Sequence, residues 1–278
     1  MIKNGVLYER RLEDDLLQEY FLYVPTDCKM GAKLLFSVHG LSRNAKDIAE
    51  HLVPFAEKYG VVLVVPLFSE ERFSDYNIMG NTGKGYRPDH ALQKIVAEVG
   101  NMTPADTEQI YLFGFSAGGQ FVHRYALAYP ERIAKMVVGA SGWYTFPDPT
   151  VPYPRGILPA SNMLDIPIKL DQFLHISTCI LVGELDIQLT ASLDQSPEIN
   201  EQQGINRVER GRRWYFAIRE AAGNRGLKTI YHYRTLRNSG HDFVQCMQNG
   251  DMGRFIFDFL FSNSAVITNM HQNVLKVK

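Results

Sequence analysis

One serine lies among small residues in a pattern that could make it a nucleophile. Residues 114–119 read Gly-Phe-Ser-Ala-Gly-Gly, directly after the apolar run 110–113 and before a segment with helical spacing. A sharp turn from strand to helix would hold the Ser116 hydroxyl above the sheet, and such a turn requires small neighbours. The pattern therefore predicts a serine for nucleophilic catalysis, the alternative being a tight turn capped by a serine.

The motif, together with the pair His39-Gly40 behind another apolar run, resembles the α/β-hydrolase superfamily. The sequence at both places is similar to that of small esterases related to polyhydroxybutyrate depolymerases and feruloyl esterases. The resemblance covers roughly Phe36 to His241. It implies a Ser–acid–His triad in that chain order, with the acid after a late strand and the histidine after the last strand.

Eight histidines compete for the role of the base. His241 lies in the sequence Asn-Ser-Gly-His-Asp-Phe, between the last expected strand and the last expected helix, where the superfamily has its base. A neutral imidazole there could take the proton of Ser116 and return it to the leaving group. The others are expected to be structural, exposed or without supporting context: His39, His51, His90, His123, His175, His232 and His271.

The acid of the triad is expected at Asp186. It ends the sequence Val-Gly-Glu-Leu-Asp after the apolar run 179–182, which is the place the resemblance implies. Its carboxylate would accept a hydrogen bond from the far ring nitrogen of His241 and so fix the tautomer. Glu184 and Asp194 are rivals on nearby backbone.

Two backbone N–H groups are expected to form an oxyanion hole. The resemblance places one arm at Ala117, just after the nucleophile, and the other at Leu41, after His39-Gly40. Such donors stabilise the negative oxygen of a tetrahedral intermediate. Gly40 would let the backbone approach the substrate closely. A plain turn at the end of a strand is the alternative for this second arm.

Aromatic residues in two irregular segments are candidates for substrate contact. The candidates are Phe73 and Tyr76 in the loop 68–87, and Trp143 and Tyr144 in the proline-rich segment 142–174. Their rings could line a pocket for an acyl or alcohol group, or could simply pack that segment against the body.

Buried strands alternate along the chain with amphipathic helices, which predicts an α/β protein with a mostly parallel sheet covered by helices on both faces. Together with the resemblance this predicts the α/β-hydrolase fold. Strands are expected at 34–38, 61–65, 110–113, 133–138, 178–182 and 229–233. Helices are expected at about 47–59, 116–129, 205–222 and 252–260, and a further helix is expected to begin at Pro88. We expect one domain over 1–278, with 142–174 inserted as a cap and a mobile tail after Ser262.

Composition excludes several classes of function. The 278 residues carry a formal net charge of −1, which offers nothing to a polyanion, so no nucleic-acid partner is expected. The basic stretch Arg207 to Arg213 is expected to be a solvated helix face. No apolar run approaches the roughly 18 residues of a membrane helix, so no membrane partner is expected.

Cysteine and histidine usage points to a reducing compartment without a metal site. Three widely spaced cysteines make no disulfide framework, and the charged N-terminus lacks the core of a signal peptide, so a cytoplasmic location is expected. The chain has no Cys-x-x-Cys and no His-x-x-x-His, so neither a metal nor another cofactor is implied.

These features predict a serine esterase acting on a small or medium carboxylic ester through an acyl-enzyme. The expected partner is a small-molecule ester, and a homo-oligomer remains open. A peptidase or amidase similar to prolyl oligopeptidases is one alternative, although 278 residues leave no room for the additional domain of those enzymes. A non-catalytic binding protein that keeps the fold is the other.

Overall fold

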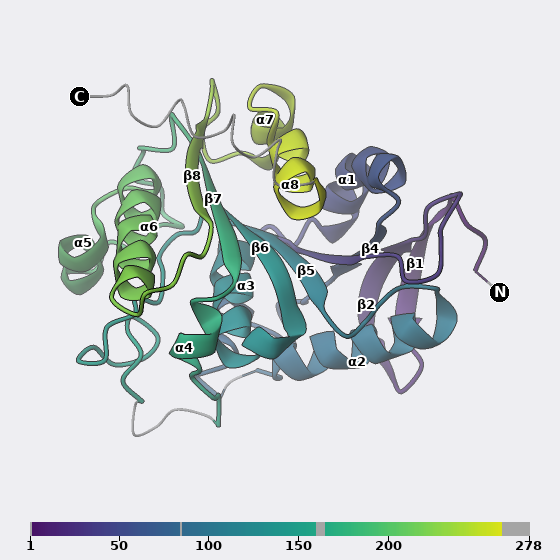
Figure 1. The fold of residues 1–278 in the computed structure, drawn as a ribbon, viewed down its shortest axis with the longest axis horizontal. Coiled ribbons are helices and arrows are strands. Elements are labelled where there is room, and N and C mark those ends of the chain that lie inside the picture. The colour runs from purple at the N-terminus through teal and green to yellow at the C-terminus, as the bar shows by residue number, and fades with distance from the viewer. Residues whose placement is uncertain (1, 84, 160–164, 263–278) are drawn as a thin grey trace.

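The chain folds around one sheet of eight strands (Figure 1). The computed structural model describes residues 2–83, 85–159 and 165–262. In these residues the strands are β1 (Leu7–Leu12), β2 (Asp15–Tyr23), β3 (Leu34–Val38), β4 (Val62–Pro66), β5 (Ile110–Phe115), β6 (Ile133–Gly139), β7 (Ser177–Gly183) and β8 (Tyr231–Leu236). The helices are α1 (Ala45–Tyr59), α2 (Pro88–Met102), α3 (Ala117–Ala128), α4 (Leu170–Phe173), α5 (Pro197–Gln203), α6 (Arg207–Gly223), α7 (Phe243–Gln248) and α8 (Met252–Phe261).

The strand order is β1-β2-β4-β3-β5-β6-β7-β8. Strand β2 pairs antiparallel with β1 and β4, and every other pair in the sheet is parallel. All residues of β3 and β4 are buried, as expected where helices cover both faces of a sheet. The predicted α/β-hydrolase fold, with a mostly parallel sheet, is confirmed.

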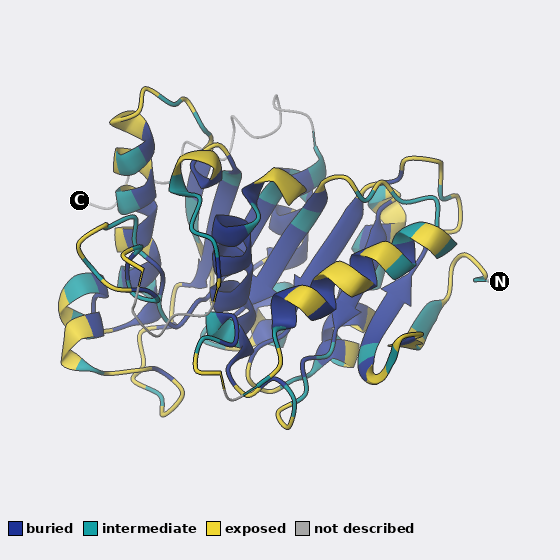
Figure 2. Ribbon diagram, turned by 90° about the horizontal axis from the view of Figure 1, so that it is seen from below, coloured by how far each residue is buried: buried dark blue, intermediate teal, exposed yellow. Residues whose placement is uncertain are grey.

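Helices cover the two faces of the sheet in separate groups. Apolar side chains of α2, α3 and α6 join one buried cluster, and those of α1, α7 and α8 join the other. Figure 1 shows α1, α7 and α8 together on one side of the strands and α2, α3 and α6 on the other. In Figure 2 the strands are dark blue, and the long helices in front carry yellow exposed stripes, which is the amphipathic pattern that the sequence predicts.

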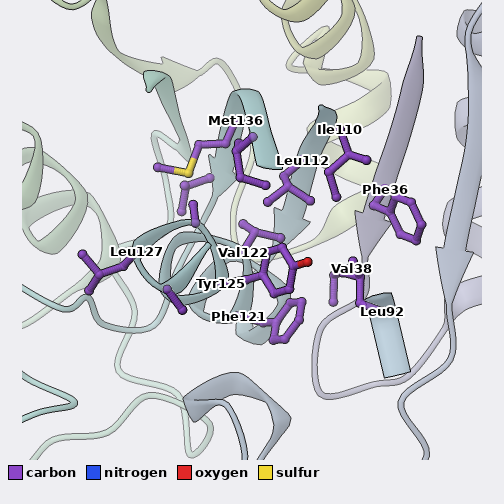
Figure 3. Close-up of a cluster of buried hydrophobic side chains, with 14 of the residues drawn as sticks. Phe36, Val38, Leu92, Ile110, Leu112, Phe121, Val122, Tyr125, Leu127 and Met136 are labelled. Carbon is purple, nitrogen blue, oxygen red and sulfur yellow. The ribbon is translucent and has the colours of Figure 1, made fainter. Parts of the chain in front are cut away.

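Helix α3 is the most deeply buried helix among the described residues. All twelve of its residues are buried. Phe121 and Val122 lie among side chains from three neighbouring strands, including Val38 of β3, Leu112 of β5 and Met136 of β6 (Figure 3). Burying one such side chain contributes about 1.5–3 kcal/mol. The helix that follows Ser116 is therefore a rigid support.

Five elements were not expected from the sequence, among them α4, whose four residues are too few for a helical period to show. Strands β1 and β2 lie at the sheet edge, where Leu16 and Leu17 are exposed and charged side chains interrupt the alternation. Helices α5 and α7 have only seven and six residues, too few for a helical period to show. The expected mobile tail, 263–278, lies outside the described residues.

The predicted cap segment 142–174 contains, in its described part, one short helix, α4, and an isolated bridge between Pro152 and Leu158. Its start is tied to the body through the backbone. Tyr144 N donates to Gln203 Oε1 at 2.8 Å, and Thr145 N donates to His123 Nε2 at 3.0 Å. The segment packs along α3 at this point. Its assignment as a cap within a single domain stays a prediction.

Candidate active site

Ser116 lies in a strained turn between β5 and α3. Its φ of 58° and ψ of −117° are rare for a residue with a side chain. Neighbouring glycines allow the turn, since a Cβ on Gly114 would meet Gly118 O at 2.2 Å and one on Gly118 would meet Val38 O at 2.1 Å. The strand–turn–helix setting required by the serine motif is therefore present.

Hydrogen bonds join the three residues expected to form a triad. His241 Nε2 lies 3.0 Å from Ser116 Oγ, and His241 Nδ1 lies 2.8 Å from Asp186 Oδ2. Asp186 follows β7 and His241 follows β8, so the carboxyl ends of parallel strands bring the residues together. Phe115 stacks on the His241 ring at a centroid distance of 5.4 Å, which limits the tilt of the imidazole.

The two rival carboxylates accept hydrogen bonds from backbone N–H groups: Asp194 within its own loop, and Glu184 from the loop after β8. Glu184 Oε1 accepts from Asn238 N at 2.7 Å, and Asp194 Oδ1 accepts from Ser196 N at 2.9 Å. Neither has a hydrogen bond to His241 in the described part of the chain. Of the three acids, the geometry joins only Asp186 to the imidazole.

Arg207 corrects the expectation of a solvated basic helix face. Its side chain is buried, and Nη1 donates to Asp186 Oδ1 at 3.2 Å. Arg210 is also buried, and it donates to backbone carbonyls that include Gly142 O at 2.7 Å. Burial lowers the pKa of Arg207, and the Asp186 carboxylate partly offsets that effect. The helical spacing of Arg207, Arg210 and the buried Trp214 was the signal that this face points inward.

The His39-Gly40 turn lies directly against the serine. A Cβ on Gly40 would be 3.3 Å from Ser116 Cβ. His39 is buried, its Nε2 accepts from Phe68 N at 3.0 Å, and its Nδ1 therefore donates to Gly40 O at 2.8 Å. Burial lowers the pKa of His39 to about 4, so its ring is neutral and structural.

The backbone geometry at Leu41 and Ala117 concerns the two N–H groups that were expected to form the oxyanion hole. The C=O and N–H of a trans peptide point in opposite directions, and Gly40 O points at the His39 ring. The N–H of Leu41 therefore points away from that ring. Ala117 is the first residue of α3, so its N–H has no carbonyl partner within its own helix.

Of the four aromatic residues expected at the substrate, three are inside the protein. Phe73, Tyr76 and Tyr144 are buried, whereas Trp143 is half-buried. Tyr76 Oη donates to His39 O at 2.7 Å, and the Tyr144 ring stacks on Trp214 at 4.8 Å. The three buried rings pack loops against the body and offer no surface to a ligand. In the sequence, an irregular segment whose aromatic rings pack inside the protein cannot be told from one whose rings line a pocket.

The described residues hold neither a metal-binding cluster nor a membrane-spanning helix. No group of three or more His, Cys, Asp and Glu side chains in them is arranged to hold a metal ion. No helix in the same residues has the length and apolar character needed to cross a membrane. All three cysteines are free thiols.

Comparison with known proteins adds to this geometry. A family profile for the alpha/beta hydrolase fold matches residues 39–161, while no curated protein sequence matches. A poly(3-hydroxybutyrate) depolymerase from Bordetella parapertussis superposes with a TM-score of 0.75 at 26% identity, over 96% of this chain and 94% of that chain. Poly(aspartic acid) hydrolase-1 from Sphingomonas sp. KT-1 gives 0.75 at 24% identity, over 93% of this chain and 99% of the other. An S-formylglutathione hydrolase from Agrobacterium tumefaciens gives 0.58 at 16% identity, over 91% and 94%.

The sheet topology and the profile define the class of fold: the chain has the α/β-hydrolase fold, and residues 39–161 match the profile for that fold. Its hydrolase fold is similar to that of a poly(3-hydroxybutyrate) depolymerase over nearly the whole chain. Both steps confirm the resemblance drawn from the serine motif and the His39-Gly40 turn.

Proposed function

We propose that the protein is a serine hydrolase that cleaves carboxylic esters through an acyl-enzyme. The observation that carries this proposal is the continuous chain of hydrogen bonds from Ser116 Oγ through His241 to Asp186. In the first step His241 Nε2 takes the hydroxyl proton while Ser116 Oγ attacks the ester carbonyl carbon. The same proton then passes to the departing alcohol oxygen, and an acyl group remains on Ser116.

Water completes the cycle in the proposed reaction. His241 removes a proton from a water molecule that attacks the acyl carbon, and it then protonates Ser116 Oγ as the acid product leaves. Asp186 accepts from His241 Nδ1 at 2.8 Å, which keeps Nε2 free to act as the base and stabilises the imidazolium.

The oxyanion formed in both steps would be stabilised by Leu41 N–H and Ala117 N–H. One arm directly follows the nucleophile, and the other follows the glycine whose backbone touches it. A single oxyanion donor typically contributes about 2.7–4 kcal/mol to transition-state stability. Trp143, which is half-buried and packs on the Arg124 guanidinium at 4.2 Å, is the aromatic residue that we retain as a substrate contact.

Amide cleavage is the alternative, since one structural relative is a poly(aspartic acid) hydrolase and the residues of that polymer are joined by amide bonds. A panel of p-nitrophenyl esters of graded acyl length, run beside aminoacyl anilides, separates the two. Higher kcat/KM on the esters supports the proposal. Turnover of the anilides alone would replace it with amidase activity.

A further inference from the structure

One helical turn after Ser116, α3 carries a glutamine whose side-chain amide has hydrogen-bond partners at its oxygen but, among the described residues, none at its nitrogen. Gln120 N donates to Ser116 O at 3.1 Å, which places the residue next to the proposed nucleophile. Its Oε1 accepts from Asn77 Nδ2 at 3.1 Å and from Arg124 Nη1 at 3.2 Å. The side chain is 7% exposed, yet Nε2 has no hydrogen-bond acceptor in the described part of the chain.

These contacts fix which way the amide points. Two donors on Oε1 leave that atom no other role, so Nε2 must occupy the opposite position. There it lies beside Gly142, because a Cβ on that residue would be 3.0 Å from Gln120 Nε2. Donors that polarise an amide oxygen also strengthen the N–H of the same amide. The result is an oriented donor with no partner among the described residues, on the residue one helical turn after Ser116.

A buried cation lies behind this donor. Arg124 is 1% exposed and forms no ion pair within the described residues. Its guanidinium donates to neutral oxygens, Asn77 O at 2.6 Å and Thr145 Oγ1 at 3.0 Å, and the ring of Trp143 covers it at 4.2 Å. Burial lowers the pKa of Arg124 to about 10, so the group stays charged at neutral pH.

An uncompensated buried charge is costly in a protein interior, and an anion placed nearby would offset that cost. A carboxylate is the group that both the Gln120 amide and the charge behind it would favour. A hydrogen bond from a donor to a carboxylate is about twice as strong as one between neutral groups.

We propose that Gln120, oriented by Asn77 and Arg124, determines specificity by donating Nε2–H to a carboxylate carried by the substrate. The preferred substrates are then esters with a free carboxylate in the acyl or the alcohol part. This proposal rests on the ester hydrolysis proposed above. If instead Gln120 only ties the loop of Asn77 to α3, its substitution will change stability and leave selectivity alone.

The test compares esters matched in length. The mono-p-nitrophenyl ester of adipic acid carries the carboxylate in the acyl part, 4-carboxyphenyl hexanoate carries it in the alcohol part, and p-nitrophenyl hexanoate and phenyl hexanoate are the neutral partners. For the wild type we expect the ratio of kcat/KM, acidic over neutral, to exceed one in one of the two pairs. The ratio should fall as salt is added, since salt screens charge interactions.

Gln120→Glu keeps an acceptor for Asn77 and Arg124 while it removes the donor and neutralises the cation. The ratio should drop about tenfold or more, the size expected for one hydrogen bond to a charged group. Gln109→Glu adds the same charge at the opposite end of β5, on an exposed side chain, and should leave the ratio unchanged. Gly142→Ala crowds Nε2 without a change in charge and should lower the ratio by a smaller factor.

The outcomes separate this inference from the proposed function. If no ester is turned over, or if turnover survives in Ser116→Ala, the hydrolase proposal itself fails. If the neutral esters are cleaved at Ser116 but neither pair shows a preference for the acidic member, the carboxylate subsite is overturned. It is equally overturned if either Gln120→Glu or Gly142→Ala, as a folded protein, keeps the wild-type ratio. Because Gly142→Ala leaves the amide and its partners in place, the test remains decisive where Gln120→Glu does not fold.

Discussion

Asp186 is held from two sides, by His241 at Oδ2 and by Arg207 at Oδ1. The carboxylate is 2% exposed, so protein groups rather than water compensate its charge. An orientation fixed by two partners keeps the imidazole in one tautomer and one plane, which the proposed proton transfers require. In the proposed mechanism Arg207 is a positioning residue that acts through Asp186.

Substitution of Arg207 tests that role. In Arg207→Met the Asp186 carboxylate loses one buried charge partner, and breaking such a pair costs about 3–5 kcal/mol of stability. We also expect kcat to fall by roughly tenfold to a hundredfold, as for partners that orient a functional ligand. Arg207→Lys, which keeps the charge, should recover part of kcat. The exposed Arg212→Met on the same helix is the control. A kcat equal to that of the control would show that Arg207 does not contribute to catalysis through Asp186.

The acid role can be assigned by three conservative substitutions. Asp186→Asn should lower kcat on the order of 10⁴-fold, because an amide no longer enforces the tautomer of His241. Glu184→Gln and Asp194→Asn should stay within a few-fold of the wild type, since each carboxylate accepts from a backbone N–H and neither bonds to His241 in the described residues. Steady-state kinetics with one good ester decides. A larger loss in either of the latter two would transfer the role to that residue.

Around Ser116 the backbones of α3, β3 and β5 approach one another closely, because the residues at the contacts are glycines. Gly118→Ala would drive a Cβ to 2.1 Å from Val38 O and so separate α3 from β3. Overpacking of this kind typically costs about 1–3 kcal/mol, and we expect activity to fall with it because Ser116 moves. The thermal midpoint and kcat should both decrease.

Gly223→Ala, at the last residue of α6, is the matched control. A Cβ there meets no atom within 4 Å. Stability should be unchanged or higher by about 0.4–1 kcal/mol, because alanine restricts the unfolded chain. Equal midpoints for the two variants would show that the turn at Ser116 is looser than the distances imply.

Elements with strong apolar patterns could be predicted from the sequence, and the remaining elements could not. The parallel strands β3 to β8 and the helices α1, α2, α3, α6 and α8 follow from buried runs and helical spacing. Ser116, Asp186 and His241 could be singled out by their places after strands. The inward face of α6 shows in the helical spacing of its residues, but the pairing of Arg207 with Asp186 could not be predicted, since no motif or strand end marks Arg207. Burial of Phe73 and Tyr144 depends on neighbours that the sequence does not specify.

At the scale of the whole molecule, buried neutral histidines predict instability in acid. Burial lowers the pKa of His39 to about 4, and burial together with Arg124 lowers the pKa of His123 well below its ordinary value of 6.5. The unfolded chain takes up protons below pH 6.5 where the folded chain does not, so unfolding becomes more favourable as pH falls. The stability is complete above about pH 6.5, and for His39 about 3 kcal/mol of it is lost by pH 4.

Urea midpoints measured from pH 7.5 to 4.5 test this expectation. They should fall with pH, and the fall should be shallower in His39→Asn, whose overall stability will be lower. His90→Gln, at an exposed histidine, should reproduce the wild-type slope. A wild-type midpoint that stays constant down to pH 4.5 would contradict the burial of neutral imidazoles.

The central claim is that Ser116 is the nucleophile of a hydrolase, and covalent labelling tests it most directly. The folded protein is treated with a fluorophosphonate, and the modified peptide is identified by mass spectrometry. We predict one adduct on the peptide that contains Ser116, loss of ester hydrolysis in proportion to labelling, and no adduct in a folded Ser116→Ala variant. Labelling at another serine, or full hydrolytic activity in Ser116→Ala, would contradict the account.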